Sequence, residues 1–205
     1  MKNPTRQTLI IPALIALGLL ATAPASSADV DPAWLASWQE AQKQRPQRLP
    51  NSGRIAPAEE PGIPLLIQGL VLNPNGSPAS GVAVHAYHRD SAGYEFGKDQ
   101  KASKTWRLQG WAKTDSAGVF RFETIRPAAD HLGREPGHIH FTLDSAEFGR
   151  QWAPKVFFSD DPQVSTALRK KSDKAGDLGN VRAVKMVDEV QTVGVRFKLK
   201  RKADF

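Results

Sequence analysis

The sequence predicts an all-β fold, a β-sandwich of mostly antiparallel strands with a short N-terminal helix and arm. Three observations predict it. Apolar and polar residues alternate in short runs, the pattern of strands with one face turned to a core. Turn sequences such as Asn73-Pro74-Asn75-Gly76 and Asp115-Ser116-Ala117-Gly118 separate the runs. At least seven short strands at this spacing favour a sandwich.

The N-terminus has the pattern of an export signal. Lys2 and Arg6 form a basic lead, and an apolar run follows from Leu9 to Ala21. Small residues at 25–28 suit a cleavage site. The run is shorter than the roughly 20 apolar residues of a membrane-spanning helix. We expect residues 1–28 to be removed, leaving a periplasmic or secreted protein outside the membrane; an uncleaved anchor is the alternative.

Residues 29–62 are expected to form an N-terminal helix and a linker arm. Asp31 and Pro32 suit a helix start, and Pro46 ends the pattern. Trp34 and Trp38 lie four residues apart, on one helical face, which would pack on the main domain or on a second subunit. The segment 51–64 is rich in proline and glycine and is expected to be irregular.

The sandwich domain is expected to span residues 63–205. A charged segment at 163–179 interrupts it and is expected to be partly helical. Each expected strand shows alternation or a short apolar run between turn signals. The strands are expected at 65–72, 82–88, 108–114, 119–124, 138–143, 152–158 and 191–199.

Two histidines lie on one of these strands, in the segment 136–141. Because side chains alternate along a strand, His138 and His140 point to one face and Ile139 and Phe141 to the other. Two imidazoles on one rigid strand make a pair of metal ligands. A histidine pair on a solvated face is the alternative.

Composition narrows the function classes. The chain has 28 Lys and Arg against 21 Asp and Glu, a formal net charge of +7. These charges form no helical basic stripe and do not interleave with aromatic residues, so nucleic-acid binding is not expected. The absence of cysteine excludes disulfides, thiolate zinc sites and a cysteine nucleophile.

Other polar and aromatic residues are interpreted structurally. His85 and His88 lie three apart on one strand and face opposite ways, so they are expected to be structural or surface residues. The segment Asp160-Asp161-Pro162 is interpreted as a turn. Three tryptophans are expected to pack in the core or to line an aromatic pocket: Trp106, Trp111 and Trp152.

A longer pattern surrounds the histidine pair. Thr124-Ile125-Arg126-Pro127 precedes Pro136-Gly137-His138-Ile139-His140-Phe141, and Phe157-Phe158 with Asp161-Pro162 follows. Gly69, Asn75-Gly76 and Gly81-Val82 come before. Over roughly 66–162, this pattern resembles the intradiol ring-cleavage dioxygenases, which include the catechol and protocatechuate dioxygenases. Its glycine-rich first half also occurs in transthyretin-like modules.

The resemblance implies a mononuclear non-haem Fe(III) site with two tyrosinates and two histidines. A hard ferric ion favours anionic oxygen donors, and imidazole fills the remaining positions. It also implies a catechol-like aromatic substrate that is opened by O2 between its two hydroxylated carbons, and a homodimer formed partly through N-terminal segments. Arg134 lies about where the family places a cation that stabilises charge on the substrate; a surface arginine is the alternative.

The histidines match the family pattern and the tyrosines depart from it. Glu95 occupies the place of the first family tyrosine, directly after Tyr94, and Asp130 occupies the place of the second. We expect Tyr94, His138 and His140 to hold iron, with Asp130 or His131 as the fourth ligand. Two histidines with Asp130 or Glu95 would instead suit Fe(II) or another divalent ion.

The expected function is that of an exported non-haem iron dioxygenase that cleaves catechol-type rings. The alternative is a non-catalytic or differently metallated β-sandwich module that binds a metal, a phenolic ligand or a protein partner. A structural transthyretin-like module without metal would leave the histidine pair unexplained.

Overall fold

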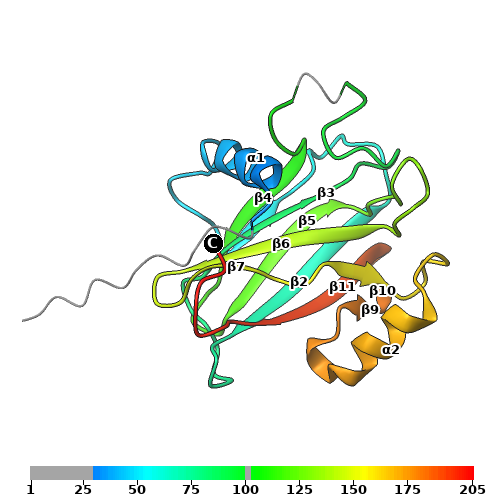
Figure 1. Ribbon diagram of the computed structural model, residues 1–205. Helices are drawn as coiled ribbons and strands as arrows, with labels where there is room; N and C mark the ends of the chain where they lie inside the picture. The colour runs from blue at the N-terminus through cyan, green and yellow to red at the C-terminus, as the bar shows by residue number, and fades with distance from the viewer. Residues whose placement is uncertain (1–29, 100–102) are drawn as a thin grey trace, which may run out of the picture.

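The protein is described here as a computed structural model in which residues 30–99 and 103–205 are placed. Two β-sheets lie face to face, with one helix over the outer face of one sheet and a second helix at the far end (Figure 1). This confirms the β-sandwich. The expected signal at residues 1–28 lies outside the described residues. Within the placed ranges, no helix is long and apolar enough to cross a bilayer.

The first sheet has five strands in the order β1-β5-β2-β11-β10. Alternation in β2 follows the sequence, since Leu65, Ile67, Gly69 and Val71 are buried while Leu66, Gln68 and Leu70 are more exposed. The long strand β11 runs parallel to β2 across the middle of the sheet. The strand bounds are β1 Ser52–Arg54, β2 Pro64–Leu72, β5 Val119–Ile125, β10 Val184–Val187 and β11 Val190–Lys198.

The second sheet has the order β4-β3-β6-β8-β9, and β7 pairs with β6. Every residue of β3 is buried, so this strand is covered on both faces. The strand β6 lies beside β3 and carries the histidine pair. The strand bounds are β3 Ala83–His88, β4 Leu108–Lys113, β6 His138–Ser145, β7 Gly149–Trp152, β8 Val156–Phe158 and β9 Val181–Arg182.

The main core lies between the two sheets. Phe120 and Phe122 come from the first sheet and Ile139 and Phe141 from the second, all at most 2% exposed. The ring centroids of Phe120 and Phe141 lie 6.4 Å apart. Because Ile139 and Phe141 face this core, the histidines of β6 face outward, as the alternation predicts.

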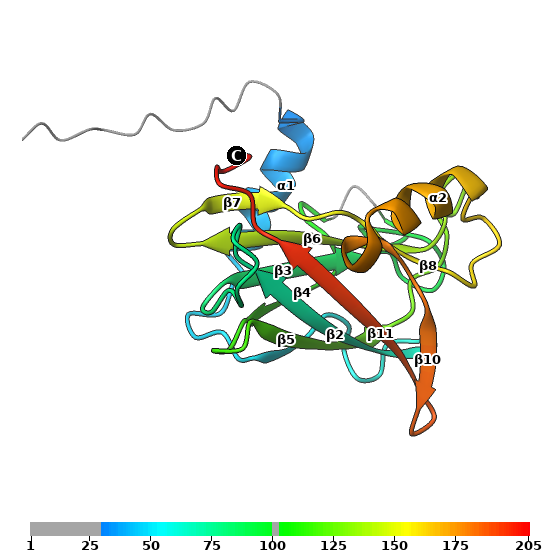
Figure 2. The same cartoon turned by 90° about the horizontal axis from the view of Figure 1, so that it is seen from below.

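A second, aromatic cluster covers the outer face of the second sheet, beneath the helix α1 (Pro32–Gln42). The Asp31 side chain caps α1 by accepting a hydrogen bond from the Ala33 amide. Trp38 is 6% exposed and packs with Tyr87, Trp106 and Trp111. Figure 2 shows α1 above β6 and β7, on the side away from the first sheet. The helix therefore packs on its own domain.

The helix α2 (Thr166–Lys174) and the 3-10 turn η2 (Gly176–Leu178) form the partly helical segment expected at 163–179. Ser165 caps α2 by accepting from the Leu168 amide. In Figure 1 this helix lies at the opposite end of the molecule from α1.

Two segments differ from expectation. The segment 51–64, expected to be an irregular arm, contains β1, which pairs in parallel with β5 and leads to Ile55 in the core. The expected strand 152–158 is divided into β7 and β8. Pro154 lies between them, and proline cannot donate a hydrogen bond to a β-ladder.

Candidate metal centre

The two imidazoles of β6 meet at their Nε2 atoms. The distance from His138 Nε2 to His140 Nε2 is 2.9 Å. His138 Nδ1 lies 2.7 Å from the Pro136 carbonyl oxygen, which can only accept a hydrogen bond. Nδ1 therefore carries the ring proton, and Nε2 has a free lone pair. Two ligands at right angles and about 2.1 Å from one ion lie about 3.0 Å apart. The pair therefore has the spacing of adjacent ligands on one ion.

The start of β6 is fixed by backbone contacts. The Gly137 amide donates to Asp161 Oδ2 at 2.9 Å. A Cβ on Gly137 would lie 2.5 Å from the Pro127 carbonyl oxygen, so only glycine fits this close approach. The turn at Asp161, interpreted from the sequence as structural, thus holds the strand that carries His138.

Both histidines are held neutral. Burial lowers the pKa of His138 to about 4, although the Pro136 carbonyl works against the shift. Burial, followed by the neighbouring His138, Lys155 and Arg89, lowers the pKa of His140 well below its ordinary range. Neutral imidazole is the metal-binding form, so both rings are available as ligands at neutral pH.

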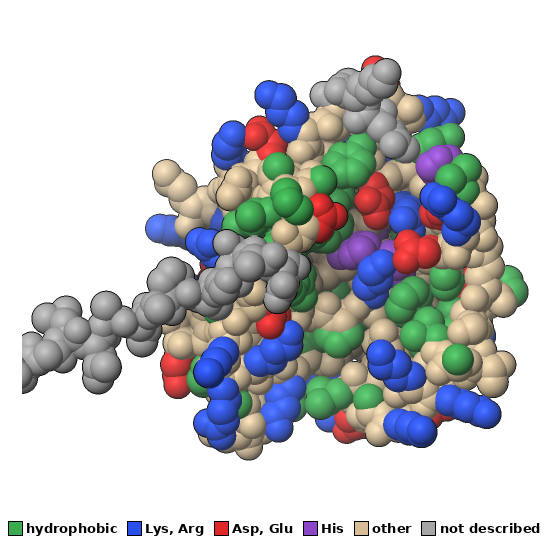
Figure 3. Space-filling view, in the orientation of Figure 1, with side chains coloured by type: hydrophobic (Ala, Val, Ile, Leu, Met, Phe, Trp, Pro, Cys, Tyr) green, Lys and Arg blue, Asp and Glu red, His purple; other side chains and the backbone are tan. Residues whose placement is uncertain are grey.

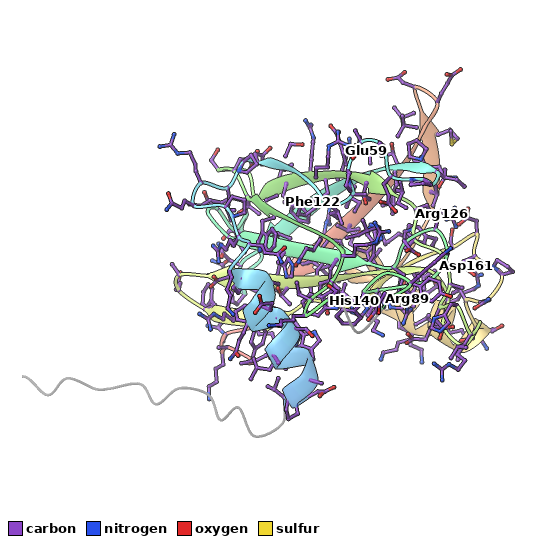
Figure 4. The ribbon with its side chains drawn as sticks, turned by 90° about the horizontal axis from the view of Figure 1, so that it is seen from above. Glu59, Arg89, Phe122, Arg126, His140 and Asp161 are labelled. Carbon is purple, nitrogen blue, oxygen red and sulfur yellow. The ribbon has the colours of Figure 1, made fainter. Side chains whose placement is uncertain are left out.

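Two carboxylates flank the histidine pair. Glu95 Oε1 lies 3.7 Å from His140 Nε2, and Glu135 Oε2 lies 4.0 Å from His138 Nε2. Arg89 Nη2 bridges them, at 3.4 Å from Glu95 and 3.1 Å from Glu135. Burial raises the pKa of Glu95, and the charge of Arg89 opposes that shift. Figure 4 shows Arg89 and His140 at the same end of the sheet.

The loop that carries Glu95 is tightly built. Asp90 Oδ1 accepts from the amides of Ala92 and Tyr94. At Gly93, with φ of +86°, a Cβ would lie 2.4 Å from the Ala129 carbonyl oxygen, so the loop packs directly on the segment that precedes β6. This packing brings Glu95 close to His140.

The other expected ligands make contacts with residues outside the pair. The ring of Tyr94 stacks on His131 with centroids 4.6 Å apart. Asp130 accepts hydrogen bonds from the Arg134 and Glu135 amides, and these lower its pKa although burial works to raise it. In the part of the chain that the structure describes, no hydrogen bond, ion pair or ring contact joins Tyr94, Asp130 or His131 to the pair.

Arg134, expected to stabilise a bound substrate, is 71% exposed and pairs with Asp130 at 3.3 Å. Both line a small cavity of about 170 Å³ next to the pair, together with Arg89 and Glu95. Sequence reasoning missed Arg89, Glu135 and Lys155, because none of them lies in a spacing that marks a ligand.

The second tyrosine is also committed elsewhere. The ring of Tyr87 stacks on His140, with centroids 4.6 Å apart and planes 7° apart. Its hydroxyl accepts a hydrogen bond from Trp34 Nε1 at 2.8 Å. Burial raises the pKa of Tyr87, which favours the neutral phenol. Tyr87 is thus a wall of the site and points its oxygen toward α1.

A cavity of about 400 Å³ opens beside His140. Trp34, Tyr87 and Trp152 give it aromatic walls, and Lys155 and Asp31 add charge at its edge. Trp106 and Trp111 are buried in the cluster beneath α1, whereas Trp152 lines this cavity. Figure 3 shows histidine side chains in the middle of this face, with acidic, basic and hydrophobic side chains around them.

The residues present fit a ferric two-tyrosinate centre only in part. The paired imidazoles fit, while the Tyr87 hydroxyl is bonded to Trp34 and the Tyr94 ring stacks on His131. Among the placed residues, no three His, Cys, Asp or Glu side chains already converge as an ion site. In the described part of the chain, the imidazoles meet, and no hydrogen bond joins a tyrosine hydroxyl to them.

The fold and the site together define a class. It is a two-sheet sandwich with paired neutral imidazoles on an outer face, flanked by carboxylates, at the edge of an aromatic cavity. The dioxygenase family model matches residues 41–201. The chain belongs to the intradiol ring-cleavage dioxygenase family. Members of this family generally use non-haem Fe(III), and they act on catechol-like substrates with O2.

Curated relatives match part of the chain. Catechol 1,2-dioxygenase 1 of Acinetobacter lwoffii is 29% identical over 127 residues, which cover 54% of this chain and 40% of the relative. The protocatechuate 3,4-dioxygenase beta chain of Burkholderia cepacia is 30% identical over 113 residues, which cover 51% of this chain and 48% of the relative. The chain thus spans less than half the length of these relatives.

Solved structures share the fold. The dioxygenase domain of a carbohydrate-binding fusion protein from Streptomyces sp. SirexAA-E superposes with a TM-score of 0.55 at 21% identity, covering 76% of this chain and 91% of that one. Acinetobacter radioresistens catechol 1,2 dioxygenase gives a TM-score of 0.57 at 15% identity, covering 84% and 69%.

Proposed function

We propose that this protein is an exported, iron-dependent dioxygenase that cleaves catechol-type aromatic rings between the two hydroxylated carbons. The observation that carries the proposal is the pair of Nε2 atoms 2.9 Å apart, directly beside an aromatic cavity of about 400 Å³. Family membership supports the reaction class.

The cavity suits a flat aromatic substrate. Trp34, Tyr87 and Trp152 offer ring faces and edges, which bind aromatic rings by stacking and exclude water. Lys155 lines the same cavity and gives it a cation that favours a deprotonated catechol oxygen. His140 borders the cavity, so a ring bound there could place its hydroxyl groups next to the pair.

The reaction balances without an outside reductant. The bond between the two hydroxylated carbons breaks, both atoms of O2 enter the product, and a ring-opened dicarboxylic acid forms. An iron ion held by His138 and His140 would supply the position that receives the substrate oxygens and lets O2 react with the ring. The protein residues would keep the imidazoles neutral, orient the ring and exclude water.

Oxygen uptake tests this function. Iron-loaded protein without residues 1–28 is expected to consume one O2 per catechol, with the absorption of a ring-opened diacid as the second readout. His138→Ala should abolish both, since it removes half of the imidazole pair. Met186→Ala, at a side chain that is 63% exposed on β10, is the control and should keep most of the activity. Absence of uptake with catechol, protocatechuate and hydroxyquinol would overturn the proposal.

A second candidate function is a metal-binding module without ring cleavage. It is favoured by the contacts of the two tyrosines, since the Tyr87 hydroxyl is bonded to Trp34 and the Tyr94 ring stacks on His131. That candidate predicts metal retention that depends on His138 but no oxygen uptake with any of the three substrates.

A further inference from the structure

The carboxylate of Glu95 lies in the place where the family pattern has its first tyrosine. We propose that Glu95 is the anionic ligand of this centre, so that His138, His140 and Glu95 bind a divalent ion and no tyrosinate takes part. This donor set departs from the ferric centre of the family. It rests on the proposed function only in using the same histidine pair.

The distances bring Glu95 nearly into place. Glu95 Oε1 lies 3.7 Å from His140 Nε2, and its side chain is 25% exposed. Adjacent ligands at right angles and about 2.1 Å from one ion lie about 3.0 Å apart, so Glu95 has to approach the pair more closely than it does here. The three side chains do not yet converge among the placed residues. Rotation about the single bonds of the Glu95 side chain would bring its oxygen closer, and the hydrogen-bonded Asp90–Tyr94 turn holds the backbone just before it.

Glu135 is the competing carboxylate and is held more firmly. It accepts hydrogen bonds from Arg89 at 3.1 Å and from Lys155 at 3.0 Å, and its side chain is 42% exposed. It also lies farther from the pair, at 4.0 Å from His138 Nε2. Binding an ion through Glu135 Oε2 would compete with its charge-assisted hydrogen bond from Arg89, whereas Arg89 approaches Glu95 only at 3.4 Å.

The local charges favour a divalent ion over a trivalent one. Glu95 and Glu135 carry two negative charges and Arg89 and Lys155 two positive charges, so with neutral imidazoles they sum to zero. The charge of a bound ion is then not compensated, and the cost of placing it there rises steeply with that charge. Two histidines and one carboxylate with open positions are also typical of Fe(II) sites.

Metal titration tests the donor set without turnover. Fe(II) is titrated into the metal-free protein without oxygen, with calorimetry as the readout. Glu95→Gln keeps the shape of the side chain and removes its charge, so the affinity should fall at least about tenfold. Glu135→Gln and Tyr94→Phe are matched controls and should stay within about threefold. Equal affinity of wild type and Glu95→Gln, or a tenfold loss in Tyr94→Phe, would overturn the proposal.

A spectroscopic gain of function gives an independent readout. Wild type loaded with Fe(III) should show no visible tyrosinate charge-transfer band. Glu95→Tyr restores the residue of the family pattern, so this band should appear in the ferric variant. A band in wild type would contradict the proposal, because it requires a tyrosinate ligand. Should Glu95→Tyr not fold, the calorimetric comparison with Glu95→Gln decides.

The two proposals fail separately. Loss of Fe(II) affinity in Glu95→Gln together with no oxygen uptake by wild type would support the donor set and remove the ring-cleaving function. If wild type takes up oxygen, and Glu95→Gln keeps both that uptake and the Fe(II) affinity, the ring-cleaving function is supported and the donor set is removed.

Discussion

His85 shows how a single buried side chain ties stability to pH. It is 3% exposed and stacks on Trp111 with ring centroids 4.6 Å apart. Its Nε2 meets Gln109 Oε1 at 3.0 Å, while its Nδ1 is buried without a hydrogen-bond partner. An imidazolium needs acceptors at both nitrogens, so the site favours the neutral ring. Burial lowers the pKa of His85 to about 4.

The stability of the folded protein should therefore fall in mild acid. His85 has a pKa near 6.5 in the unfolded chain and about 4 in the folded protein. Its contribution to the free energy of unfolding is therefore fully present above pH 6.5 and is lost as the pH falls from 6.5 to 4. At pH 5 this one group costs about 2 kcal/mol. Urea unfolding at pH 7.5 and pH 5 measures the loss, and His85→Gln should reduce it by about that amount. An equal acid loss in the variant and wild type would contradict the assignment.

Residue patterns place the two histidines of the candidate site side by side, and they do not determine how the loop residues around them pack. Strand alternation alone places His138 and His140 on one face, because side chains two residues apart on a strand point the same way. Ligands that come from loops depend on how each loop packs. Tyr94 and Asp130 were placed by their offsets from the motif, but Tyr94 stacks on His131 and Asp130 binds the turn at Arg134.

At the scale of elements, two glycines let the sheets touch at one edge. A Cβ on Gly53 in β1 would lie 2.3 Å from the Trp111 carbonyl oxygen, and a Cβ on Gly110 in β4 would lie 2.2 Å from the Arg54 carbonyl oxygen. Backbone therefore meets backbone where β1 crosses β4. This contact joins the second sheet, which carries the histidines, to the first.

Gly110→Ala should separate these two strands. The new methyl group would press on backbone atoms, which cannot rotate away, so we expect a loss of about 2–3 kcal/mol in the free energy of unfolding. Gly194→Ala on β11 is the matched control, because a Cβ there meets nothing within 4 Å. Its stability should equal or slightly exceed that of wild type. Chemical denaturation of both variants measures the difference; equal stabilities would show that the close approach is not required.

Long alternating runs predicted the central strands, while short edge strands escaped prediction. β2 and β11 are nine residues each, and burial alternates along β2 and from Val193 to Phe197 of β11, so their pattern is visible in the sequence. β1 has three residues and β9 has two, too few to show a period. Their places follow from pairing with β5 and β8, which only the folded chain brings near.

At the scale of the whole molecule, segments far apart in the sequence meet over the outer face of the second sheet. Phe205 packs on Trp34 and Trp38 of α1, with ring centroids 5.2 Å away in each case, and on Trp152 of β7 at 4.8 Å. Trp34 also binds the hydroxyl of Tyr87, which stacks on His140. Rings rather than backbone pairing thus hold α1 against the cavity beside the histidines.

Phe205→Ala should consequently weaken the packing of α1 and affect substrate binding in the cavity beside the histidines. Removing this partly buried ring should cost about 1–2 kcal/mol and lower Tm by roughly 3–6 °C. The affinity for a catechol should fall as well, because Trp34 of α1 is a wall of the cavity, whereas Fe(II) affinity should not change, because no ligand lies on α1. Calorimetric melting and titrations with catechol and Fe(II) measure the three quantities.

Met186→Ala, at a side chain that is 63% exposed, is the control and should leave Tm, catechol affinity and Fe(II) affinity unchanged. Unchanged catechol affinity in Phe205→Ala would separate α1 from substrate binding and leave it a stabilising cover of the aromatic cluster.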